Sequence, residues 1–244
     1  MTRALLTTLL AGLLLTSAVH AETVNVAVAA NFTRVAEELA PLFVAASGHD
    51  VSYSFGATGQ LYNQISQGAP FELFLAADDE RPSKAVEEGL GVDGAVFTYA
   101  IGALALYSTT LDLADGKAVL EAGGFDKLAI ADAAAAPYGR AAAEVIAALG
   151  LTDAITPKLV TGENISQTLQ FIESGNAELG FVAASQVVGK SSVWIVPAAL
   201  FEPIRQNAVL LKTGQANPAA TAYIDFLRSD AAVAVIEAAG YVVE

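Results

Sequence analysis

Short apolar runs alternate with helical stripes along most of the chain. Residues 24–29 are apolar and rich in Val, and Val35, Leu39 and Phe43 then recur at four-residue spacing before a Ser-Gly pair at 47–48. The same unit follows at once, with a strand-like run at 51–55 and a stripe of Leu61 and Ile65. Such alternation of strand and helix patterns predicts an α/β fold built on a largely parallel sheet.

Later segments continue the same pattern to the end of the chain. Further strands are predicted at 73–76, 103–107, 128–131, 179–182, 193–196 and 208–211. Further helices are predicted at 82–88, 138–149, 165–172, 218–227 and 231–239. Gly or Pro stands at several of the predicted ends, where these residues stop or start a helix.

The first 21 residues have the pattern of a secretory signal. Arg3 precedes an apolar, Leu-rich run at 4–15, and a small-x-small ending follows at 18–21. A transmembrane helix needs about 20 consecutive apolar residues, and this run is shorter. We therefore expect residues 1–21 to be a cleaved signal peptide, with a mature protein in the periplasm and no stable insertion in the membrane.

Composition and charge exclude several classes of function. The chain has 244 residues, 54% of them hydrophobic and 16% charged, with a formal net charge of −14. So negative a molecule repels phosphate backbones, which argues against a nucleic-acid partner. The chain has no Cys, which excludes disulfides, thiolate metal sites and Cys nucleophiles.

The residues that enzymes need are also scarce. The mature chain holds one His, His49, which we expect in an exposed turn, so no hydrolytic triad or histidine metal site is predicted. The acidic run 78–80 is expected to be a solvated loop. Gly56 and Gly59 are too closely spaced for a P-loop and lack its Lys. We predict a protein that is not an enzyme, has no direct metal-ion ligands and needs no cofactor.

Four predicted strand-to-helix turns share one kind of chemistry. They lie at 29–31, 56–59, 137–139 and 163–165, and each is made of small or helix-capping residues. The first N–H groups of a helix have no partner within it, and the helix dipole makes that end positive. In an open α/β sheet such turns lie on the ligand side. Any one of these turns alone is interpreted as an ordinary helix start, with Asn31, Thr58 and Asn164 as caps. An anion site would form only if several of the turns converged on one point.

The motifs around these turns resemble a known family. Residues 25–32, 54–61 and 68–78 are similar to successive motifs of the periplasmic molybdate-binding proteins, and the similarity continues through 137–139, 179–182 and 239–241. The resemblance covers almost all of the mature chain. It implies a two-lobed solute-binding fold of type II, with each lobe a mixed or parallel sheet flanked by helices. It also implies an oxyanion in the cleft between the lobes and delivery to an ABC-type permease.

The resemblance also implies which residues contact the oxyanion. They are the N–H of Ala30 with Asn31 from the first turn, the hydroxyl of Thr58, and the main-chain N–H groups of Tyr138 and Ile165. Some family members supply a Tyr hydroxyl where this chain has Ala183. A neighbouring Ser185 and a water molecule remain as alternatives for that donor.

We expect the chain to cross between the two lobes twice, at strands 103–107 and 208–212. Lobe 1 is then residues 22–103 plus 208–244, and lobe 2 is the inserted segment 104–207. The protein is expected to act as a monomer. Arg34, Arg140 and Arg205 are the arginines considered for contact with the ligand, although the resemblance implies a pocket without cations.

The ligand that the resemblance implies is a dianion, and its protonation state explains how an acidic protein can select it. Molybdate and tungstate carry no proton at neutral pH, so a pocket of hydrogen-bond donors satisfies every oxygen. Phosphate keeps a proton, and burying it without an acceptor costs about 1–3 kcal/mol. Sulfate is also free of protons but smaller, so binding of sulfate or another oxyanion remains the alternative function.

Overall fold

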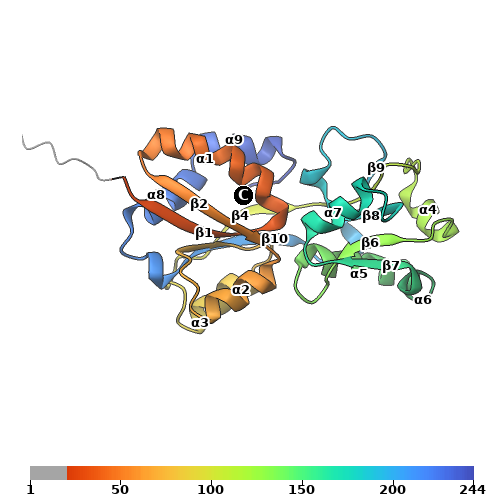
Figure 1. The fold of residues 1–244 in the computed structure, drawn as a ribbon, viewed down its shortest axis with the longest axis horizontal. Coiled ribbons are helices and arrows are strands. Elements are labelled where there is room, and N and C mark those ends of the chain that lie inside the picture. The colour runs from red at the N-terminus through yellow and green to blue at the C-terminus, as the bar shows by residue number, and fades with distance from the viewer. Residues whose placement is uncertain (1–20) are drawn as a thin grey trace, which may run out of the picture.

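The computed structural model describes residues 21–244, so the predicted signal peptide lies outside the described residues except for Ala21. These residues form two five-stranded sheets, each in its own lobe, side by side along the longest axis (Figure 1). Within 21–244, none of the helices has the length and apolar character needed to cross a bilayer.

The first sheet has the strand order β2-β1-β3-β10-β4. Its strands are β1 (Thr23–Ala29), β2 (Asp50–Gly56), β3 (Leu73–Leu75), β4 (Phe97–Gly102) and β10 (Ile204–Leu210). β1 pairs in parallel with β2 and β3, whereas β10 runs antiparallel to β3 and β4. The sheet is therefore mixed, as the resemblance implies.

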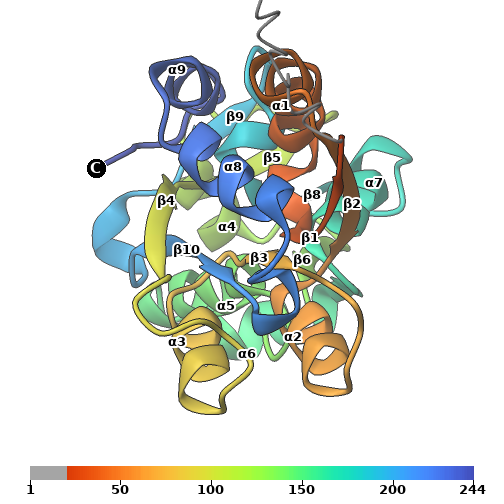
Figure 2. The same cartoon turned by 90° about the vertical axis from the view of Figure 1, so that its left-hand side faces the viewer.

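Helices cover both faces of this sheet. On one face lie α1 (Thr33–Ser47), α8 (Pro218–Leu227) and α9 (Asp230–Ala238), and on the other lie α2 (Thr58–Ser66) and α3 (Glu80–Glu87) (Figure 2). The predicted stripe of Val35, Leu39 and Phe43 is fully buried against the sheet. α1 ends at Gly48, whose φ of 72° is the left-handed conformation that glycine adopts most easily.

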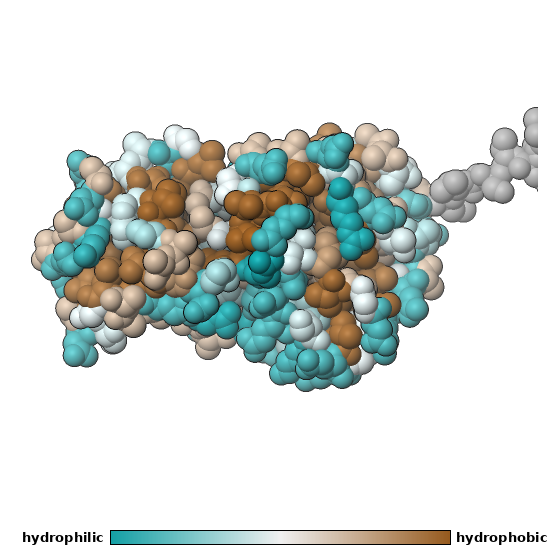
Figure 3. Space-filling model, turned by 180° about the vertical axis from the view of Figure 1, so that it is seen from behind, coloured by the Kyte–Doolittle hydropathy of each residue, from teal (hydrophilic) through white to brown (hydrophobic). Residues whose placement is uncertain are grey.

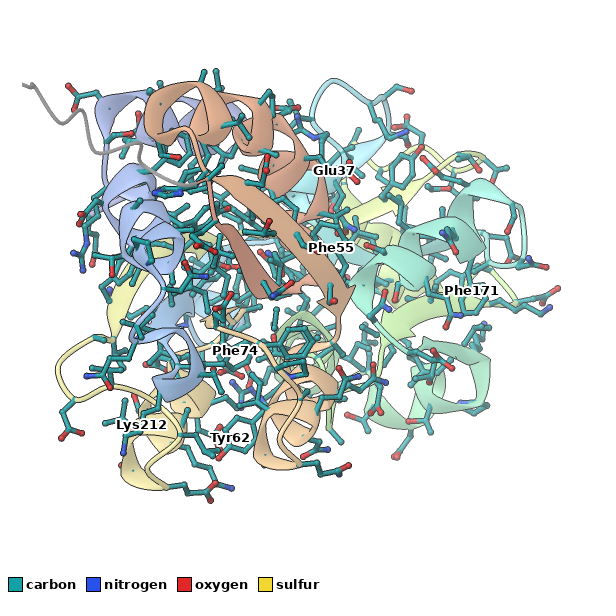
Figure 4. The ribbon with its side chains drawn as sticks, turned by 60° about the vertical axis from the view of Figure 1, so that its left-hand side comes forward. Glu37, Phe55, Tyr62, Phe74, Phe171 and Lys212 are labelled. Atoms are coloured by element: carbon teal, nitrogen blue, oxygen red, sulfur yellow. The ribbon has the colours of Figure 1, made fainter. Side chains whose placement is uncertain are left out.

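The opposite face has a separate apolar cluster. Phe74 of β3 and Tyr62 of α2, both labelled in Figure 4, belong to it together with Leu61 and Ile65. Because strand side chains alternate between faces, Leu73 and Leu75 pack with α1 and α8 instead. A sheet covered on both sides needs strands without polar interruptions, and β3 has none.

The second sheet has the order β7-β6-β8-β5-β9. Its strands are β5 (Leu104–Ser108), β6 (Leu128–Ala131), β7 (Leu159–Gly162), β8 (Leu179–Ala183) and β9 (Val193–Ile195). The helices of this lobe are α4 (Gly116–Ala122), α5 (Pro137–Ala148), α6 (Thr152–Ile155) and α7 (Ile165–Glu173).

The chain crosses between the sheets twice. β4 ends at Gly102 and β5 begins at Leu104, so Ala103 alone separates a strand of one lobe from a strand of the other. The return comes between β9 and β10, because β10 pairs with β4 from Ile204 onward. The first sheet thus resumes four residues before the predicted position 208. The strand was predicted to begin too late because the polar residues Gln206 and Asn207 interrupt its apolar pattern.

Two single-residue expectations were wrong. His49 is only 6% exposed, and its Nδ1 accepts a hydrogen bond from the Glu22 N–H at 3.2 Å. Asp78 is 3% exposed rather than solvated, because it ends the buried segment that continues from β3 through Ala76 and Ala77, although its neighbours Asp79 and Glu80 are exposed. In each case a polar partner within the fold allows the burial.

Candidate functional site

A small pocket lies where the two lobes meet. Apart from Ala77, which follows β3, its lining comes from four turns in which a helix begins. The lining is uncharged throughout: Ala29, Ala30, Asn31, Gly56, Ala57, Thr58, Ala77, Ala136, Pro137, Tyr138, Asn164 and Ile165. The cavity is about 10 Å³. A cavity of this size has room for about one water molecule, so in this arrangement the pocket excludes sugars, peptides and nucleotides.

All five residues singled out in the sequence line this one pocket. Ala30 and Asn31 open the 3₁₀ helix η1 (Ala30–Phe32), which follows β1 directly, and Thr58 is the first residue of α2. From the second lobe, Tyr138 lies in the first turn of α5 and Ile165 begins α7. The four turns therefore converge, two from each lobe.

Main-chain donors are available at each of these turns. Within residues 21–244, the N–H groups of Asn31, Thr58, Tyr138 and Ile165 donate to no other backbone or side-chain group. Such groups are left without partners at the start of every helix. Gly59 differs, because its N–H already donates to the carbonyl of Ala135 at 2.8 Å. The pocket is thus surrounded by N–H groups that need an acceptor.

Thr58 adds a side-chain donor. The residue is 1% exposed, and its Oγ1 accepts the N–H of Ala77 at 3.0 Å. No acceptor for its hydroxyl proton lies among the described residues, so that proton is free for a ligand. The Ala77 contact also orients the hydroxyl, because it fixes where the oxygen lone pair points.

The side-chain amide of Asn31 is not available to donate hydrogen bonds to a ligand. Its Nδ2 donates to Oε1 of Gln206 at 2.7 Å and to the hydroxyl of Tyr241 at 2.9 Å. An amide nitrogen has two protons, so both are in use. The group of Asn31 that remains for a ligand is its main-chain N–H, and its side chain anchors the turn to the lobe behind it.

No cation reaches the pocket from the described part of the chain. The three arginines considered in the sequence pair with acids on the surface: Arg34 with Glu38, Arg140 with Glu80, and Arg205 with Glu244, at 2.7, 3.4 and 2.6 Å. None of them lines the cavity. Positive potential at the site therefore comes from the N-terminal ends of α2, α5 and α7.

The structure describes both residues considered for a donor after β8, Ala183 and Ser185. Ala183 is fully buried and does not line the pocket. The hydroxyl of Ser185 bonds to the Tyr241 hydroxyl at 2.9 Å and to the carbonyl of Asn31 at 3.5 Å. Ser185 therefore lies behind the turn that holds Asn31 rather than in the pocket.

Asp78 lies beside the site in a partly buried ion pair with Arg81. It accepts the N–H of Arg81 at 3.0 Å and pairs with the Arg81 guanidinium, which also donates to the carbonyl of Ala134 in the other lobe at 3.1 Å. Burial raises the pKa of Asp78 above its usual value, and the nearby Arg81 opposes that effect. The carboxylate is occupied by this arginine and does not enter the pocket lining.

Some residues around the site carried no signal in the sequence. Ala77 and Ala136 line the pocket but resemble any other small residue. Gln206 and Tyr241, which hold Asn31, lie 175 and 210 residues away from it along the chain. A polar Gln at a fully buried strand position indicates such a contact, but its burial is known only from the structure.

Comparison with known proteins assigns the chain to a family. Residues 24–242 match the model of the bacterial extracellular solute-binding proteins. The chain belongs to this family. It is 53% identical over 220 residues to a molybdate-binding protein, ModA, of Rhodobacter capsulatus, covering 89% of this chain and 87% of that protein. It is 52% identical over 237 residues to ModA of Azotobacter vinelandii, covering 95% and 94%.

A solved structure matches the whole fold. The periplasmic molybdate-binding protein of Azotobacter vinelandii superposes with a TM-score of 0.88 and 38% identity, covering 91% of this chain and 99% of that one. The predicted two-lobed α/β fold of the periplasmic solute-binding proteins is thereby confirmed, as is the resemblance to the molybdate-binding members. Membership of this family makes the chain a binding protein and not an enzyme.

Proposed function

We propose that this protein binds molybdate, and tungstate with it, outside the cytoplasm and delivers it to an ABC-type membrane permease. Two relatives above 50% identity are molybdate-binding proteins, and both align with most of this chain. The observation that carries the proposal is the convergence of four turn starts, two from each lobe, on one uncharged pocket.

We assign the oxyanion to Ala30, Asn31, Thr58, Tyr138 and Ile165. The free donors at these positions suit a ligand whose oxygens only accept hydrogen bonds. A protonated phosphate needs an acceptor, and the lining has no carboxylate to provide one. Leaving that O–H unpaired costs about 1–3 kcal/mol, which favours ligands without protons.

The two lobes and their closure complete the proposal. We take lobe 1 as residues 22–103 plus 204–244, and lobe 2 as residues 104–203, with the boundaries following the two sheets. A ligand that contacts both lobes stabilises their closed arrangement, as in hinge closure generally. The protein acts as a monomer in the periplasm after removal of residues 1–21, and the permease recognises the rims of the closed lobes.

A panel of anions tests the function directly. A ligand that binds only the folded state raises its melting temperature, so we expect large shifts with molybdate and tungstate and none with phosphate. Isothermal titration calorimetry with the same anions gives the affinities. A shift with sulfate equal to that with molybdate would instead favour the alternative of a general sulfate or oxyanion binder, and no shift with any anion would contradict the proposal.

A further inference from the structure

A buried polar network lies directly behind the pocket and joins the two lobes. Its centre is Gln206 of β10, which is fully buried. Gln206 Oε1 accepts from Asn31 at 2.7 Å and from the Tyr99 hydroxyl at 3.3 Å. Its Nε2 donates across the lobe boundary to the hydroxyl of Tyr138, at 3.4 Å. The side chain of Tyr138 therefore contacts lobe 1, while its main-chain N–H faces the pocket.

Space for that hydroxyl is made by a missing side chain. Gly102 is the last residue of β4, and a Cβ built on it would lie 2.0 Å from the Tyr138 hydroxyl oxygen and 2.9 Å from Gln206 Nε2. The backbone of Gly102 has no positive φ, so its conformation suits any residue. Room for the Tyr138 hydroxyl, and not backbone freedom, is what requires glycine here.

Gly102 lies next to the point where the chain crosses between the lobes, so the space beside it depends on how the lobes are placed. The residue stands immediately before Ala103, where the chain crosses from the first sheet to the second. Tyr138 belongs to the other lobe and is 1% exposed, so its ring is enclosed by protein. In this arrangement of the lobes, a side chain at position 102 would collide with the Tyr138 hydroxyl.

We propose that Gly102 and Gln206 form a socket that receives the Tyr138 hydroxyl when the lobes close, and that they set ligand affinity as positioning residues without touching the ligand. This inference rests on the proposed function and adds a mechanism for closure to it. Neither residue lines the pocket. Their effect is exerted through Tyr138, whose N–H is aimed at the ligand only when its ring is seated, and through Asn31, which Gln206 holds.

The first test is Gly102→Ala, measured by calorimetry with molybdate. The added methyl clashes with Tyr138 in the closed state alone, so we expect affinity to fall about tenfold to a hundredfold. Opening relieves the clash, so the melting temperature of the ligand-free protein should stay close to that of the wild type. Small-angle X-ray scattering with saturating molybdate should show a larger radius of gyration for the variant.

The decisive test adds Tyr138→Phe, which removes the hydroxyl and keeps the main-chain N–H. In the wild-type background this change should weaken binding severalfold, because Gln206 Nε2 loses its acceptor. In the Gly102→Ala background it should strengthen binding, because it removes the most severe contact of the added methyl, the one 2.0 Å from the hydroxyl oxygen. This reversal of sign is specific to a steric socket, since two unrelated structural defects would add.

The outcomes separate the two proposals. If the wild type fails to bind molybdate, the proposed function is wrong whatever the variants do. If the wild type binds and Gly102→Ala binds equally well, the socket is wrong and the function stands. If Gly102→Ala does not fold but the double variant folds and binds, the clash with Tyr138 is supported; a double variant that also fails to fold would overturn it.

Discussion

Thr58 has two hydrogen-bonding roles in one hydroxyl group. The oxygen accepts the N–H of Ala77, and the proton is left for a ligand. We expect Thr58→Ala to weaken molybdate binding by about 1–3 kcal/mol, since the ligand loses a donor and the buried Ala77 N–H loses its acceptor. Calorimetric titration of the purified variant measures the change.

Thr58→Ser is the matched control, because serine keeps the hydroxyl and removes only a methyl group. We expect it to bind within a few-fold of the wild type. Equal affinity of the alanine variant and the wild type would remove Thr58 from the set of ligand residues.

A charge at position 31 tests the uncharged character of the pocket. In Asn31→Asp a carboxylate replaces an amide that donates to Gln206 and Tyr241, immediately beside the assigned oxyanion site. At a separation of about 5 Å and an effective dielectric constant of about 20, each pair of unit charges repels by about 3 kcal/mol. We therefore expect molybdate binding to be almost abolished, as measured by calorimetry.

The same variant at lower pH provides the control, because protonation removes the introduced charge without a further substitution. Lowering the pH neutralises the introduced carboxylate, so binding by Asn31→Asp should recover relative to the wild type at the same pH. Unchanged affinity of Asn31→Asp at neutral pH would show that the dianion lies elsewhere.

At the scale of the element, the pocket depends on how its helices begin. Asn164 caps α7 by accepting the N–H groups of Ser166 and Gln167, both at 3.0 Å, which leaves the Ile165 N–H directed at the pocket. We expect Asn164→Ala to cost about 0.5–2 kcal/mol of folding stability and to weaken molybdate binding as the first turn of α7 frays. Thermal unfolding and calorimetry measure the two effects.

Ser229 provides a matched helix cap far from the site. It caps α9 by accepting the N–H of Ala232 at 3.3 Å, and it is not among the residues that line the pocket. Ser229→Ala should lower stability by a similar amount and leave molybdate affinity unchanged. A parallel loss of affinity in both variants would mean that general destabilisation, and not the start of α7, weakens binding.

Elements with strong periodicity were predictable from the sequence. Helix α8 spans Pro218–Leu227 as predicted, because a capping Asn217 precedes Pro at its first position. Strands β4 and β7 and helices α4 and α6 were not predicted. β7 and α6 have only four residues each, and β4 mixes polar and half-buried positions that give no clear period.

For the site, too, the features formed within one segment were predictable, and the contacts between distant segments were not. The turns that line the pocket are local features, since a capping or small residue after a strand marks each of them. The contacts behind the pocket depend on register between distant strands, as with Gln206 and the Tyr138 hydroxyl from the other lobe. No pattern within one segment reports that pairing, and the volume that Gly102 leaves open is likewise visible only once the lobes are placed.

At the scale of the whole molecule, the contacts between the lobes contribute unequally to the stability of their arrangement. Buried or half-buried hydrogen bonds cross the boundary from Gly59 to Ala135 at 2.8 Å and from Ser166 Oγ to the Ala30 carbonyl at 3.1 Å. The ion pair of Arg140 and Glu80 crosses it too, but both side chains are about half exposed, and such pairs contribute about 0–1 kcal/mol. Seen from behind, the surfaces of the lobes touch (Figure 3). Of these contacts, the hydrogen bonds therefore contribute more to holding the lobes together than the exposed ion pair does.

The charge of the whole molecule opposes the approach of its ligand, whereas the pocket attracts it over a short range. The formal net charge is −14, and the helix ends that favour an anion act within about one turn. At an ionic strength of about 0.01 M the repulsion extends about 30 Å, and at 0.15 M only about 8 Å. We therefore expect the association rate of molybdate to rise as sodium chloride is added over this range, with little change in the dissociation rate.

Both rates are measured by stopped-flow mixing with protein fluorescence as the signal. Variants of two acidic residues test whether acids near the pocket slow association more than distant ones. Glu163 is exposed in the turn before α7, so Glu163→Gln should speed association at low salt. Glu121 lies on α4 at the far end of lobe 2 (Figure 1), and Glu121→Gln should change the rate much less. An association rate that falls with added salt would mean that the positive potential of the pocket outweighs the net charge at long range, contrary to this expectation.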